Sequence, residues 1–107
     1  MADIESLKER VIGVLKQIYD PEIPLNIYEL GLIYNLQIEE REEGVVCSIK
    51  MTMTAPGCPV ADMLLMQVQS IAQIVEGIER VEVTLVFDPP WNEERISYEG
   101  RLQLGLL

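Results

Sequence analysis

The residue best suited to chemistry is Cys58, which stands at a break between two apolar patterns of different period. Pro59 suits the first position of a helix, which places Cys58 close to the N-cap. Unpaired backbone N–H groups and the positive end of the helix dipole stabilise a thiolate there. The alternative is a buried thiol that packs as a small hydrophobe. The rigid turn that Pro56, Gly57 and Pro59 predict favours a presented, reactive sulfur.

The second cysteine, Cys47, has a different setting. It lies within a predicted strand, on the same face as Ile49 and Met51. Packing is the favoured interpretation for this thiol. Seven strand steps from Cys47 to Thr54 span about 23 Å. We therefore expect neither a disulfide between the two cysteines nor a metal site that uses both.

Acidic and aromatic side chains beside prolines are the remaining candidates. Asp20 and Glu22 flank Pro21, and two carboxylates this close could bind a hard cation or act as general acid and base. A turn that ends a helix, with solvated acids, is the favoured alternative. Trp91 follows two prolines, and it could cover a site, anchor a partner or pack in the core.

Composition excludes several classes of function. The chain has 107 residues, 18 acids, 8 bases, no histidine and a net charge of −10. The acidic balance argues against nucleic acid and anionic membranes as partners, and the missing histidine removes the commonest general base and metal ligand. The glycines are isolated, so no phosphate cradle is predicted. With no apolar run of membrane-spanning length, we expect a cytoplasmic protein with one domain over residues 1–107.

Periodicity predicts an α/β domain of the α+β type, with a three-stranded mixed sheet backed by two main helices. The expected elements are a helix over 3–19 capped by Asp3, strands over 32–40 and 45–53, a long helix from 60 to before Gly77, a strand over 81–87 and a short helix after Asn92. The crossover through the long helix makes the third strand parallel to the second. The pattern leaves open which strand it pairs with, and the two open edges favour self-association.

The methionines are expected to fill the core, because a flexible thioether packs well into irregular gaps. This expectation covers Met51 and Met53 on the second strand and Met63 and Met66 on the long helix. A thioether metal site is disfavoured.

Ordered motifs along nearly the whole chain resemble the SufT/PaaD-like metal-sulfur cluster assembly family. They are Asp20-Pro-Glu-Ile-Pro, Leu30-Gly-Leu-Ile-Tyr, Met51-Thr-Met-Thr-Ala-Pro-Gly-Cys-Pro, Asp88-Pro-Pro-Trp and Leu104-Gly-Leu. The resemblance implies a domain like those of iron-sulfur cluster assembly scaffolds. It also implies that Cys58 is the functional thiol and metal ligand, with Asp20, Glu22, Thr54 and Trp91 around it.

The same resemblance implies a non-enzymatic factor for iron-sulfur cluster assembly, maturation or transfer. Its partners would be the assembly machinery and apo client proteins, whose basic patches suit the acidic surface. The phenylacetate-degradation branch of the family is expected to carry further C-terminal cysteines. This chain has no cysteine after Cys58, which favours the stand-alone assembly-factor branch.

One candidate thiolate per chain limits the cofactor, because iron-sulfur clusters usually take four soft ligands. The alternatives are a labile cluster bridged across a homodimer, a cluster completed by a small thiol or a client, and no cluster at all. Without a cluster, the protein would be an adaptor that recruits clients to the machinery. A redox-active Cys58 is the weakest alternative, since no histidine activates it and no resolving cysteine is near.

Overall fold

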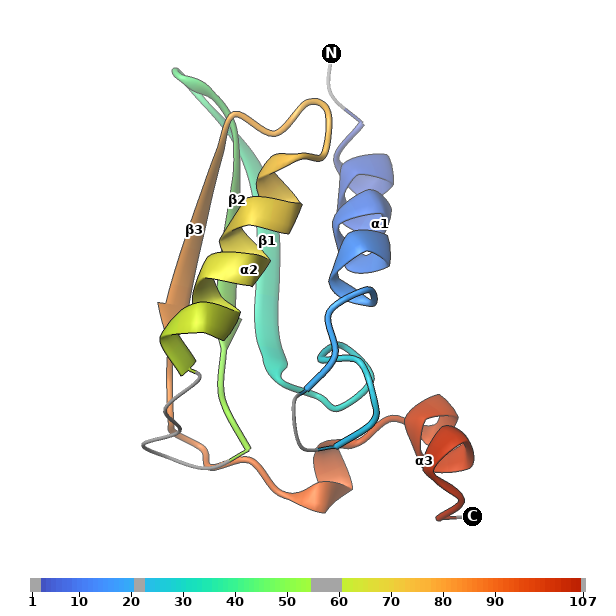
Figure 1. The fold of residues 1–107 in the computed structure, drawn as a ribbon. Helices are drawn as coiled ribbons and strands as arrows, with labels where there is room; N and C mark the ends of the chain where they lie inside the picture. The colour runs from blue at the N-terminus through green and yellow to red at the C-terminus, as the bar shows by residue number, and fades with distance from the viewer. Residues whose placement is uncertain (1–2, 21–22, 55–60, 107) are drawn as a thin grey trace.

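The structure, a computed structural model, describes residues 3–20, 23–54 and 61–106. Its elements follow in the order α1 (Ile4–Leu15), β1 (Ile33–Arg41), β2 (Gly44–Met51), α2 (Ala61–Gln73), β3 (Arg80–Leu85), a 3₁₀ turn η1 (Glu93–Arg95) and α3 (Tyr98–Leu104). Helices α1 and α2 lie side by side on one face of the sheet, and α3 lies beyond one end of it (Figure 1). The predicted α+β architecture is confirmed. None of the helices in the described ranges has the length and apolar character needed to cross a membrane.

The sheet has the strand order β1-β2-β3. Strands β1 and β2 form an antiparallel hairpin whose turn ends at Gly44, with a φ of 126° that glycine adopts without steric cost. Strand β3 runs parallel to β2, as predicted, with Cys47 opposite Val81 and Met51 opposite Leu85. The neighbour that the sequence left open is therefore β2, and β2 is the central strand.

Helix α1 begins as predicted and ends early. The Asp3 side chain accepts a hydrogen bond from the Ser6 N–H at 3.3 Å, which caps the first turn. The helix was expected to continue to Tyr19, but its last residue is Leu15. Beyond it, Tyr19 pairs with Asn26 in an isolated antiparallel bridge. The helix ends early because backbone groups of Ile18 and Asp20 form hydrogen bonds with Ile27 and Leu25 instead of continuing the helical pattern.

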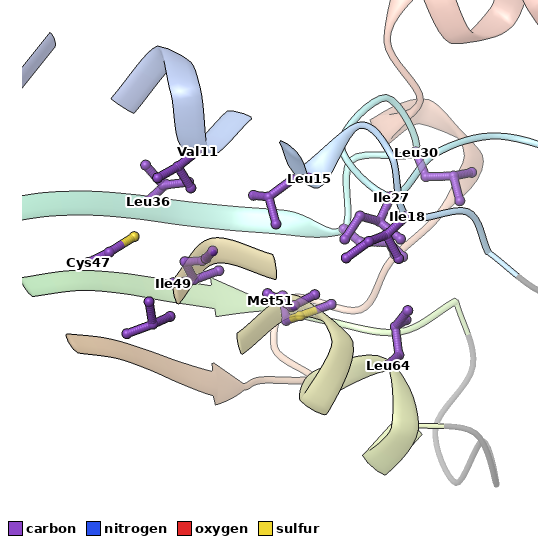
Figure 2. Close-up of a cluster of buried hydrophobic side chains, with 14 of the residues drawn as sticks. Val11, Leu15, Ile18, Ile27, Leu30, Leu36, Cys47, Ile49, Met51 and Leu64 are labelled. Atoms are coloured by element: carbon purple, nitrogen blue, oxygen red, sulfur yellow. The ribbon is translucent and has the colours of Figure 1, made fainter. Parts of the chain in front are cut away.

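One apolar core lies between the sheet and the two helices, and Figure 2 shows part of it. Its fully buried members include Val11 and Leu15 from α1, Ile49 from β2 and Val68 from α2. Cys47 is 0% exposed within the same cluster, which confirms its packing role. The inner stripe of each helix and the inner face of β2 thus form the core that their periodicity predicts.

The expectation that all four methionines fill the core is wrong for two of them. Met51 and Met53 are buried, whereas Met63 is 62% and Met66 is 69% exposed. Helix α2 covers only one face of the sheet, and its buried residues Leu64, Val68 and Ala72 repeat at four-residue spacing. Met63 and Met66 fall outside this stripe, so they point to solvent.

The sheet face away from the helices is covered by charged side chains. Arg41 on β1 contacts Glu39 at 2.6 Å and reaches across β2 to Glu82 at 3.5 Å. Arg80 completes the network with a 2.8 Å contact to Glu82. Val46 points to this face from the central strand and is nevertheless 0% exposed. Long charged side chains therefore shield the open face of the sheet.

The short helix expected after Asn92 is divided into η1 and α3. Asn92 caps η1 by accepting a hydrogen bond from the Glu94 N–H at 2.9 Å, and Ser97 caps α3 in the same manner through the Gly100 N–H. Ser97 also donates to the buried carboxylate of Glu29. These contacts attach α3 to the loop that precedes β1.

Candidate functional site

The predicted site motifs gather at the end of the sheet where the parallel strands β2 and β3 both end. The Val86 N–H after β3 donates to the Met51 carbonyl at 2.8 Å, and the Thr52 N–H donates to the Leu32 carbonyl at the same distance. Because the carboxyl ends of parallel strands meet at one edge, loops that are distant in sequence become neighbours here. The chain after β2 leaves the sheet from this end, toward Thr54.

Residues 30–34 contact the segment that follows β3. The Leu30 carbonyl accepts a 2.7 Å hydrogen bond from the indole N–H of Trp91. The Tyr34 hydroxyl donates to the Pro89 carbonyl at 2.8 Å. The guanidinium of Arg95 lies 4.5 Å from the centroid of the Tyr34 ring. The loop after β3 is therefore held against the start of β1, and a cation is placed beside it.

Both the side chain and the backbone N–H of Asp20 form hydrogen bonds to residues that follow it in the chain. Its Oδ1 accepts a 2.9 Å hydrogen bond from the Ile23 N–H, and its N–H donates to the Leu25 carbonyl at 3.1 Å. An aspartate that bonds the backbone ahead of it stabilises a tight turn. This geometry agrees with the interpretation of Asp20 as a residue that shapes a turn.

Two threonines follow β2 on the way to the cysteine motif. Thr54 is half-buried. Thr52 is 1% exposed, and among the described residues its hydroxyl has no hydrogen-bond partner. Sequence reasoning singled out Thr54 and passed over Thr52, although both belong to the Met-Thr-Met-Thr motif. The predicted strand over 45–53 places Thr52 on the face opposite Met51 and Met53, but β2 ends at Met51, so alternation no longer applies at residue 52.

Several predicted site residues lie outside the described residues, namely Cys58, Glu22, Pro56 and Gly57. The structure does bring together segments that carry three others, Asp20, Thr54 and Trp91, at one end of the molecule (Figure 1). Sequence reasoning missed the contribution of Arg95, which approaches Tyr34 from 61 residues away. No local pattern signals such a contact.

The chemistry of Cys47 is set by its burial. Desolvation raises the pKa of this thiol from 9.0 to about 11, so it stays protonated at neutral pH. A protonated and enclosed thiol is neither a good nucleophile nor a metal ligand. Within the described parts of the chain, no group of three or more cysteine or carboxylate side chains is arranged to hold a metal ion.

Comparison with known proteins supplies what the geometry leaves open. Residues 8–85 match the family model described as iron-sulfur cluster assembly protein. A similar curated protein is the Fe-S protein maturation auxiliary factor of Porphyromonas gingivalis, which is 42% identical over 100 residues covering 94% of this chain and 92% of that protein. The Fe-S protein maturation auxiliary factor YitW of Bacillus subtilis is 34% identical over 95% of this chain and 97% of its own length.

The fold points to the same family. A crystal structure of a domain of unknown function, DUF59, from Bacillus anthracis superposes with a TM-score of 0.80 and 32% identity. The match covers 96% of this chain and 95% of that one. Sequence and fold thus agree over nearly the full length of the relatives, and the chain belongs to the iron-sulfur cluster assembly protein family.

Proposed function

We propose that this protein is a non-enzymatic maturation factor for iron-sulfur proteins, in which the Cys58 thiolate binds the cluster or its sulfur as cargo. Family membership supports the process. The observation that carries the choice of residue is the burial of Cys47, which is 0% exposed and carries a raised pKa. Of the two cysteines in the chain, only Cys58 remains as a candidate ligand.

A single thiolate from each chain makes the proposed complex labile. Clusters take about four ligands, so the other ligands must come from a second copy, a small thiol or a client protein. Incomplete ligation by the protein lowers the barrier to release and suits transfer rather than storage. In this proposal Asp20, Thr54 and Trp91, together with Glu22, Pro56 and Gly57, shape the loops around the cargo.

Anaerobic reconstitution with iron and sulfide, followed by visible absorption, tests the role of Cys58. We expect the wild-type protein and Cys47→Ala to take up iron and sulfide, and Cys58→Ala to lose uptake. Cys47→Ala is the matched control, since it removes the same sulfur from a buried position. Equal uptake by the wild type and Cys58→Ala would overturn the role of this thiol.

Native mass spectrometry of the reconstituted protein distinguishes the sources of the missing ligands. One cluster for each pair of chains indicates a bridged dimer, and one cluster for each chain with added glutathione indicates completion by a small thiol. Maturation of an apo client enzyme then measures delivery. We expect Cys58→Ala to reduce the rate of client activation to the level without the factor.

A metal-free adaptor is the second candidate function, and the outer face of α2 favours it. This face exposes apolar side chains in a strongly acidic protein and is suited to binding another protein. An adaptor would mature clients equally well with Cys58→Ala. The same client assay therefore separates the two candidates.

A further inference from the structure

The outer face of α2 has an unusual composition for this protein. Charged residues make up 24% of the chain, yet none occurs from Met63 to Val75. Met63 is 62%, Met66 is 69% and Ile74 is 78% exposed. The other exposed residues of this face are neutral and polar, namely Gln67, Gln69, Ser70 and Gln73. Exposed methionine without neighbouring charge is typical of surfaces that bind other proteins.

A groove lies beside this face, where α2 meets the end of α1. A cavity of about 380 Å³ is lined by Ile18 and Tyr19 after α1, by Ser70 and Ile71 on α2, and by Ile74 just after α2. Tyr19 is 57% exposed, so its ring extends the apolar surface beyond the helix. Among the described residues that line the cavity, this phenol is the one ionisable group.

A second hollow lies at the other end of the same pair of helices, and it has a charged lining. Ser6 and Arg10 contribute from α1, and Glu76 contributes from the turn after α2. Gln17, just beyond the end of α1, lines the first hollow, and Arg10 on α1 lines the second. Gly13 lies between these two residues in the chain, and a Cβ there would meet no atom within 4 Å. Helices α1 and α2 run antiparallel (Figure 1).

The dimensions of this surface suit a helix. The 12 residues of α1 extend for about 18 Å, which is enough for some three turns of a helix packed alongside. Two adjacent helices offer ridges and grooves that a third helix can fill. Apolar side chains at positions i, i+3, i+4 and i+7 would meet Met66, Ile71 and Ile74.

Charge indicates the kind of partner. The net charge of −10 repels a second copy of the chain and attracts a basic protein. Acids stand at both ends of the neutral face, with Asp62 in the first turn of α2 and Glu76 beyond its last turn. Of two nearby bases, Lys16 is directed elsewhere, 3.8 Å from Glu29 and over the ring of Tyr28. The other, Arg10, shares the second hollow with the acids Asp3 and Glu76.

We propose that the outer face of α2, with the groove beside the end of α1, binds an amphipathic helix of a partner protein whose apolar stripe is flanked by lysine or arginine. The apolar stripe fills the groove, and the flanking bases approach Asp62 and Glu76. This surface is separate from the proposed role of Cys58, so either proposal can fail without the other.

Fluorescence anisotropy with two synthetic peptides tests the proposal. Both peptides carry leucine and methionine at helical spacing, one flanked by lysines and the other by glutamates. We expect the wild-type protein to bind the lysine peptide at least about 10-fold more tightly, with affinity falling several-fold between 50 and 200 mM salt. Equal binding of the two peptides would overturn the proposed partner.

Variants locate the binding surface. We expect Met66→Gln with Ile74→Gln to weaken binding of the lysine peptide about 10-fold. Leu102→Gln is the matched control, because Leu102 is 47% exposed on α3 and undergoes the same chemical change. We expect binding by Leu102→Gln and by Cys58→Ala to equal that of the wild type. A loss with either of them, or unchanged binding by the double variant, would contradict the assignment.

Light scattering after size exclusion addresses the remaining occupant, a second copy of the chain. We expect a monomer for the wild type and for the double variant without peptide. A wild-type dimer that Met66→Gln with Ile74→Gln converts to a monomer would overturn the proposal. Thermal unfolding checks that the exposed substitutions leave the fold intact, and we expect midpoints within about 4 °C of the wild type.

Discussion

Helices α1 and α2 cover the same face of one sheet and have nearly the same length, yet their outer faces differ. The outer face of α1 carries charges, including Glu5, Lys8, Glu9 and Arg10. The outer face of α2 carries methionine, glutamine, serine and isoleucine. Both inner faces are buried in the core, so the difference between the helices is confined to their outer faces. It indicates that α1 faces water and α2 faces a partner.

The largest expected effect tests whether the two inner faces are equivalent. Leu15 on α1 and Leu64 on α2 are 0% and 4% exposed. Replacing either with alanine leaves a cavity, and we expect each change to lower the free energy of unfolding by about 2–5 kcal/mol. Urea denaturation measures both losses. A large loss for Leu15→Ala with none for Leu64→Ala would show that α2 is not an equal part of the core.

The next effect concerns Cys47, a buried residue of the core on the central strand. Its pKa is raised from 9.0 to about 11 by burial, so the unfolded chain loses this proton at lower pH than the folded chain. Its contribution to stability is therefore complete below pH 9 and falls as the pH rises toward 11. We expect the free energy of unfolding of the wild type to fall more steeply than that of Cys47→Ala in this window. Parallel curves would show that Cys47 is accessible to water.

A smaller effect compares the gain in stability when an exposed residue of each helix is replaced by alanine, the best helix former. Gly13 on α1 has open space where a Cβ would stand, so we expect Gly13→Ala to stabilise the fold by about 0.5–1 kcal/mol. Ser70→Ala at an exposed position of α2 is the comparison, with an expected gain of about half that size. Thermal unfolding gives both values. Destabilisation by Gly13→Ala would indicate that the added methyl group meets other atoms at this position.

The smallest expected change in stability is on the outer faces themselves. Met66→Gln on α2 and Glu9→Gln on α1 should each alter the free energy of unfolding by less than about 0.5 kcal/mol, because both side chains are exposed. The two variants should differ in binding of the dye ANS, which reports exposed apolar surface. We expect Met66→Gln to reduce the fluorescence and Glu9→Gln to leave it unchanged. Equal fluorescence would remove the contrast between the helices.

The resemblance implies that Asp20, Thr54 and Trp91 surround Cys58, and this grouping stays a prediction, because Cys58 lies outside the described residues. Within the described residues, Trp91 holds the loop after β3 against residue 30, at the end of the sheet where β2 and β3 both end. The roles of Arg95 and of the enclosed Thr52 hydroxyl were missed. Both depend on contacts between distant segments, which no local pattern contains. The function of Cys58 stays a prediction for the reconstitution experiment.

The sequence by itself determined the order of elements, the inner stripes of α1 and α2, the packing of Cys47 and the parallel direction of β3. These follow from periodicity and chain connectivity, which are local or nearly local properties. Tertiary structure alone decided that β3 pairs with β2, that α1 ends at Leu15, and that Met63 and Met66 face solvent. The reason is physical: an apolar residue becomes core only where another element covers it, and that cover is set by how the elements pack.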